Sequence, residues 1–237
     1  MQPSILSNIS MEYRFHSATI SKISSLFNID DIYKIKNQTF DPIVSDEGFV
    51  LKETCFDSVF NFQYLRKVPF TYGEFNNGFI TKTDTVIKET NFQMDMTKKI
   101  IVIFSGKRQS DFLLKKISTI FKISFISLDL NFLKLIDLID DPKFIVRSEQ
   151  IVINGFNYHD LMVGKYIANI KDKEILKTVI KKYQHNVEKI KLSFEDYNEN
   201  ISHVKIHRNG SFVFNNNREE NIGIIFHFTN LIYSGDL

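Results

Sequence analysis

The segment Lys99-Ile-Ile-Val-Ile-Phe104 decides how this chain is expected to fold. Four consecutive β-branched aliphatic residues and a phenylalanine suit a strand that is covered on both faces. Ser105 and Gly106 interrupt the run, and an apolar spacing typical of a helix follows over residues 109–121. Residues 123–128 form another short apolar run. The order strand, helix, strand predicts a βαβ-like unit around a central buried strand, and a split arrangement with an inserted strand is equally allowed.

The turn after this strand is a candidate anion site. We expect Gly106 to adopt a positive φ, which glycine tolerates, so that the chain can turn into the helix. Lys107 and Arg108 then stand at a helix start, where free N–H groups and the helix dipole favour anions. The spacing is not that of a P-loop, because Ile101 and Arg108 occupy positions that require Gly and Ser or Thr. The alternative is a tight turn with two solvated cations.

A second block repeats this order of elements, with a strand expected over 164–170, a helix over 173–183 and a strand over 187–194. Another helix is expected over 129–139, ended by Asp141-Pro142. Together the two blocks predict an α+β (mixed α/β) fold with a central mixed sheet and βαβ-like units.

The two ends of the chain show hairpin and helix signals. An N-terminal helix is expected within residues 20–35. Antiparallel strands are expected over 49–92, with a hairpin turn at Asn77-Gly78. The C-terminal part predicts a hairpin over 203–214 and a last apolar strand over 222–228. We expect a hairpin-rich region 1–95 and a βαβ-type region 96–237, which can also form one continuous domain.

Composition excludes several classes of protein. The 237 residues are 43% hydrophobic and 24% charged, as in ordinary globular domains. The single cysteine, Cys55, excludes an internal disulfide and a multi-cysteine zinc site, and it favours a reducing compartment, so we expect a cytoplasmic protein. No run approaches the roughly 18 apolar residues of a membrane span. Since the net charge is only +2, any basic surface must come from clustered side chains.

Two groups of basic side chains are candidates for a nucleic-acid interface. The group near the helix 109–121 contains Lys107, Arg108, Lys115 and Lys116. The group on the helix 173–183 contains Lys173, Lys177, Lys181 and Lys182, and the basic run continues through His185, Lys189 and Lys191. Residues four apart lie on one helix face, so a stripe of this kind can follow a phosphate backbone. The alternative is a solvated helix face without a ligand.

We therefore expect a non-catalytic nucleic-acid-binding protein, for DNA or RNA, that contacts backbone phosphates through these helical faces. One alternative is an interaction or scaffold subunit whose Phe-rich region 49–92 meets a protein partner or a second copy. A third is an enzyme with an unrecognised site. No metal ligand is predicted, because His203 and His207 would lie about 13 Å apart along a strand. No catalytic residue or cofactor is predicted, because the known nucleotide-binding and hydrolase motifs are absent.

Overall fold

The computed structural model describes residues 15–24, 29–36, 39–55, 58–75, 79–138, 145–158, 162–195, 201–216 and 221–235. These residues form eleven strands and five helices. They divide into two compact units, one made of the described residues within 22–104 and 111–125, and one made of those within 15–21, 105–110 and 126–235. We call the first the hairpin unit and the second the C-terminal unit, and each is described by itself.

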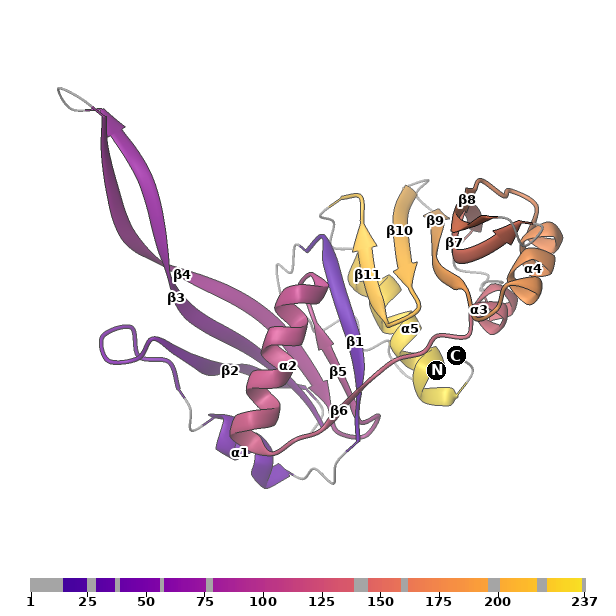
Figure 1. Ribbon diagram of the computed structural model, residues 1–237. Helices are drawn as coiled ribbons and strands as arrows, with labels where there is room; N and C mark the ends of the chain where they lie inside the picture. Colours follow the sequence, from indigo (N-terminus) through magenta and orange to yellow (C-terminus); the bar gives the residue numbers. More distant parts are fainter. Residues whose placement is uncertain are drawn as a thin grey trace. The chain divides into compact units, whose positions relative to one another are not determined.

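The hairpin unit is built on four antiparallel strands, which follow one another in the order β2, β3, β4 and β5 (Figure 1). Their bounds are β2 (Glu47–Cys55), β3 (Val59–Phe75), β4 (Phe79–Asp95) and β5 (Ile100–Ile103). The antiparallel strands expected over 49–92 are confirmed. The predicted turn at Asn77-Gly78 lies outside the described residues. β5 confirms the buried strand, since all four of its residues are buried.

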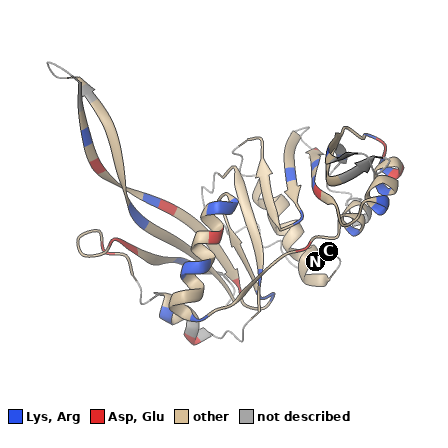
Figure 2. Cartoon of the chain, in the orientation of Figure 1, with Lys and Arg blue, Asp and Glu red and all other residues tan. Residues whose placement is uncertain are grey.

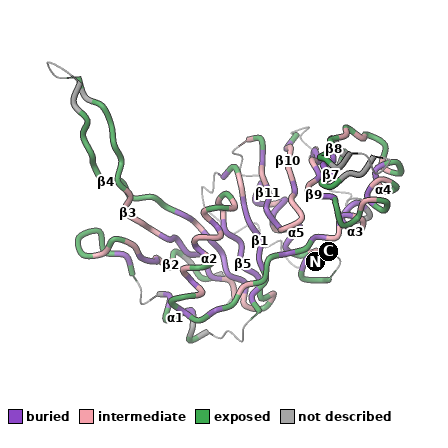
Figure 3. The backbone as a smooth tube through the Cα atoms, viewed as in Figure 1, coloured by how far each residue is buried: buried purple, intermediate pink, exposed green. Residues whose placement is uncertain are grey.

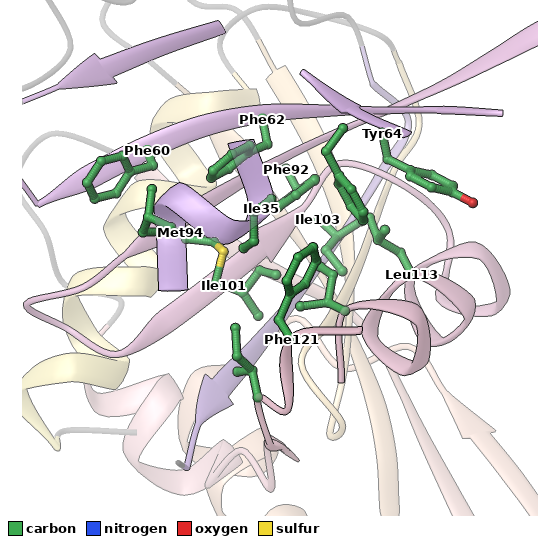
Figure 4. Packing of buried hydrophobic residues seen from close by; sticks show 14 of the residues in the cluster. Ile35, Phe60, Phe62, Tyr64, Phe92, Met94, Ile101, Ile103, Leu113 and Phe121 are labelled. Atoms are coloured by element: carbon green, nitrogen blue, oxygen red, sulfur yellow. The ribbon is translucent and has the colours of Figure 1, made fainter. Parts of the chain in front are cut away.

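Two helices complete the core of this unit, α1 (Ile29–Lys36) and α2 (Lys107–Phe121). α2 confirms the helix predicted over 109–121. Phe62 stacks on Phe92 with 5.1 Å between ring centroids (Figure 4). Phe121 of α2 packs edge-on against Phe49, with 5.5 Å between ring centroids. The many phenylalanines of the hairpin region therefore serve mainly as core residues near the base of the hairpin.

The C-terminal unit holds six strands in the order β1, β11, β10, β9, β7 and β8. Their bounds are β1 (Ser17–Ile23), β11 (Ser211–Phe214), β10 (Ile201–His207), β9 (Val187–Glu195), β7 (Ile145–Tyr158) and β8 (Met162–Ala168), with a short strand β6 (Phe125–Ser127). The hairpin predicted over 203–214 is confirmed as β10 and β11.

Three helices belong to this unit, α3 (Phe132–Leu138), α4 (Lys173–Lys182) and α5 (Asn221–Ser234). α5 covers one face of the sheet, because Phe228 packs against Phe212 of β11 and Phe194 of β9, at 5.0 Å and 6.3 Å between centroids. Residues that pair directly across antiparallel strands share a face, so this contact also identifies the opposite face of β9, β10 and β11.

The predicted α+β fold with βαβ-like units is wrong. The described residues are dominated by antiparallel strands, and β5 and β6 do not pair with each other: β5 pairs with β4, the strand just before it, and β6 pairs with β1. In the second block, β8 and β9 do not pair with each other, since both pair with β7 in antiparallel orientation. The sequence pattern identifies the order of helices and strands in these blocks, but that order does not determine which strands become neighbours.

Two local expectations and the expected role of Gly106 are also wrong. Residues 222–228 belong to helix α5, whose buried residues Ile224, Ile225, Phe228 and Ile232 recur at helical spacing. Ile20 lies in strand β1 rather than in a helix. Gly106 does not have a positive φ, and a Cβ there would meet only Ser17 Oγ at 3.6 Å, an ordinary contact.

Candidate nucleic-acid interface

On α4, the predicted basic residues border the buried face of the helix. Leu176 and Ile180 are buried, while Lys173 and Lys177 beside them are half-buried. Lys177 Nζ lies 3.5 Å from Glu174 Oε1. The two remaining basic residues, Lys181 and Lys182, are exposed. Ile175, an aliphatic residue of the same helix, is 57% exposed.

On α2, Arg108 and Lys115 are exposed, whereas Lys107 and Lys116 are half-buried. Lys116 forms an ion pair with Glu47 of β2. Burial alone would raise the pKa of Glu47, but the hydrogen bonds from Lys116 and Tyr64 and the nearby positive charges outweigh burial and lower it. Lys116 therefore has a structural partner that joins α2 to the sheet.

Lys115 and Lys116 belong to the hairpin unit, and α4 belongs to the C-terminal unit. A continuous basic surface across α2 and α4 stays a prediction, and so does an anion site at Lys107 and Arg108.

A different group of basic side chains is brought together within the C-terminal unit. His203, Lys205 and His207 alternate along β10 with the buried residues Val204 and Ile206, so they point to the face opposite α5. Across the strand pair, His207 lies opposite Lys189 of β9, and Lys205 lies opposite Lys191. We call this set of five side chains, His203, Lys205, His207, Lys189 and Lys191, the polar face. All five are half-buried.

The polar face carries lysines on the neighbouring strands β9 and β10, and Lys positions on the cartoon are blue in Figure 2. Side chains directly opposite on antiparallel strands have Cβ atoms about 4.5–5.5 Å apart, and like charges at such positions are destabilising. Lys205 and Lys191 are such a pair. Among the described residues, neither Lys189 nor Lys205 forms an ion pair with an acidic group. The fold therefore keeps a concentration of positive charge that packing does not require.

His207 reports on this positive potential. Burial lowers the pKa of its imidazole, and the neighbouring charges of Lys189, Lys205 and Lys165 lower it further, with only Glu188 acting in the opposite direction. The imidazole is therefore neutral near pH 7, when it can accept a hydrogen bond as well as donate one.

A cavity of about 620 Å³, lined mainly by polar residues, adjoins the polar face at His207. Its charged walls are largely paired with one another. Arg208 Nε donates to the carbonyl of Val187 at 2.8 Å, and Arg208 Nη1 lies 3.3 Å from Asp129 Oδ1. Glu188 Oε2 accepts from Asn154 Nδ2 at 2.9 Å. Arg208 thus holds the turn between β10 and β11 in place rather than offering its charge to a ligand.

Comparison with protein-family models and with curated proteins found no match for this chain. Among the residues that the structure describes, no helix combines the length and apolar character that crossing a bilayer requires. Within the same residues, no three His, Cys, Asp or Glu side chains lie close enough together to hold a metal ion. The site must therefore be judged from its own geometry.

The sequence contained a usable signal for the polar face. Lys189 and Lys191 belong to the basic run noted above, and His203, Lys205 and His207 alternate with aliphatic residues as on a half-buried strand. The same run also fits a helical stripe, and the sequence alone does not specify which strands lie side by side, so it does not reveal the cross-strand grouping.

Proposed function

We propose that the protein binds a nucleic-acid backbone through the polar face of its C-terminal unit. The observation that carries this proposal is the direct cross-strand pairing of Lys205 with Lys191 and of His207 with Lys189. A polyanion placed over Lys189, Lys191 and Lys205 would relieve the mutual repulsion of these three charges, and counterion release would add a salt-dependent gain.

The composition of the polar face favours phosphate contacts over base readout. Among the described residues of β9, β10 and β11, no Phe or Tyr lies on the face opposite α5. Phe194, Phe212 and Phe214 face the core instead. Proteins that hold unpaired bases usually stack them on aromatic rings. Lysines instead act as compact point charges toward phosphate oxygens. Sequence-independent binding is therefore expected.

Two variants with equal loss of charge separate this site from the helical faces. The sheet variant carries Lys189→Gln, Lys191→Gln and Lys205→Gln. The helix variant carries Lys173→Gln, Lys177→Gln and Lys181→Gln. Binding of a labelled DNA duplex and of a single-stranded RNA is measured by fluorescence anisotropy at several salt concentrations. Neither variant should lower the thermal unfolding midpoint of the unaltered protein, and the sheet variant, which removes like charges from opposite positions, can raise it.

We expect the sheet variant to lose most of its binding and the helix variant to lose little. For a duplex, removing three phosphate contacts should reduce the slope of log K against log salt by about 2.7, at about 0.9 per contact. The reverse ranking of the two variants would support the helical faces and overturn this proposal. Absence of binding by the unaltered protein at low salt would overturn both.

A further inference from the structure

The outer part of the β3–β4 hairpin is a two-stranded ribbon without other neighbours among the described residues. β2 pairs with β3 only as far as Arg66, and β5 pairs with β4 only over Phe92–Asp95. Residues 68–75 and 79–86 pair only with each other, and we call them the arm. The arm extends past the rest of the sheet of the hairpin unit, and nearly all of its described positions are exposed (Figures 1 and 3).

The arm exposes large apolar side chains to solvent. Phe70 is 52% exposed and Val86 is 42% exposed. Phe70 and Tyr72 lie on the same face and stack on each other, with 6.0 Å between their centroids. A two-stranded hairpin alone in water is marginally stable, and additional strands stabilise it. Its unpaired edges present N–H and C=O groups that can hydrogen-bond to another strand.

The edge formed by β4 is the better one for pairing. The β3 edge contains Pro69, which has no N–H to donate, whereas β4 contains no proline. The segment Thr81-Lys82-Thr83-Asp84-Thr85 of β4 also reads as self-complementary about its centre, Thr83. In an antiparallel pair related by a two-fold axis, residues equally distant from the centre on opposite sides face each other.

We propose that the arm binds the arm of a second copy of this chain, by antiparallel pairing of β4 with β4 centred on Thr83. In this register Lys82 of each copy faces Asp84 of the other, and Thr81 faces Thr85. Opposite charges and Thr–Thr pairs are both stabilising across antiparallel strands. Charge complementarity therefore selects a second copy as the occupant of this edge.

The same charges exclude the nearest alternative registers that keep the two-fold axis on a residue. Centring the pair on Lys82 places the two Lys82 side chains opposite each other, and centring it on Asp84 does the same for the two carboxylates. Both arrangements are destabilising. The register about Thr83 is thus specified by sequence in a ribbon that has no buried face to specify it.

The proposed pairing joins the two arms into a four-stranded sheet with distinct faces. One row across it would read Phe70, Asp84, Lys82 of the second copy and Tyr72 of the second copy, since Phe70 faces Asp84 and Tyr72 faces Lys82 within each arm. The other face would continue the threonine pair Thr71 and Thr83, whose hydroxyl oxygens lie 3.4 Å apart within one arm.

Charge reversal tests this pairing. Lys82→Asp places two acidic pairs in the interface, and Asp84→Lys places two basic pairs there. Each variant alone should weaken the dimer by about tenfold or more. A mixture of the two variants restores opposite charges at both positions, so it should form a heterodimer. Lys88→Asp, on the same strand but beyond the paired segment, is the matched control and should dimerise like the unaltered protein.

Size-exclusion chromatography with light scattering, over a concentration series up to about 1 mM, measures the assembly. The expected result is a dimer for the unaltered protein and the control, monomers for each charge variant, and a dimer for their mixture. A monomeric unaltered protein at the highest concentration would overturn the proposal. So would charge variants that still dimerise alone, or a mixture that stays monomeric although circular dichroism shows both variants folded.

Discussion

Gly210 offers the sharpest test of the fold, because replacing it with alanine should destabilise the C-terminal unit strongly. Its φ is +78°, a region that costs residues with a Cβ about 1–2 kcal/mol. A Cβ there would also lie 2.7 Å from the carbonyl oxygen of Ile20 and 2.8 Å from Leu128 Cδ1. The carbonyl cannot withdraw freely, because the Ile20 N–H donates to the Gly210 oxygen at 2.9 Å and ties β1 to this turn. Overpacking of this kind typically adds about 1–3 kcal/mol.

The expected loss of unfolding free energy for Gly210→Ala is therefore about 2–5 kcal/mol, the sum of the backbone and overpacking costs. Urea unfolding followed by circular dichroism measures it. Gly235→Ala is the matched control, because its φ is +79° but no atom lies within 4 Å of the added Cβ, so only the backbone cost applies. Gly106→Ala should cost less than either, since Gly106 has neither positive φ nor a close contact. A Gly210→Ala loss no larger than that of Gly235→Ala would refute the reasoning.

Two further predictions concern titrating groups. Because the pKa of His207 is lowered, the folded state binds fewer protons than the unfolded state. This histidine therefore lowers the stability of the fold as the pH falls below about 6.5. His207→Gln should flatten the pH dependence of urea unfolding in that range. An unchanged dependence would contradict this. The pKa of Glu47 is lowered, so this carboxylate adds stability that is lost as the pH falls through that pKa. Lys116→Met should raise the pKa of Glu47 in an NMR titration. It should also lower the free energy of unfolding by about 1 kcal/mol at pH 7. A Glu47 pKa that does not move would show that Lys116 is not its main partner.

Local elements were predictable wherever a short-range pattern identifies them. The run over 99–104 became the buried strand β5, and the helical spacing over 109–121 became α2. The hairpin over 203–214 also formed as expected. In each case the apolar period or the turn residues lie within the element itself, so no distant contact is needed to specify it. The strand predicted over residues 222–228 is wrong, because a short apolar run suits a buried helix as well as a buried strand.

Only the tertiary structure decided which strands pair and which charged side chains therefore lie opposite each other. Nothing local to β5 shows that it pairs with β4, and nothing local to Lys205 shows that Lys191 lies opposite it. Register across strands depends on which faces are buried together, and that is a property of the whole sheet. The sequence by itself determined β5, α2 and the β10–β11 hairpin, together with the number of basic residues. Folding determined that five half-buried basic and histidine side chains share one face of a sheet, because only hydrogen-bonded neighbours bring residues from separate strands within about 5 Å of each other.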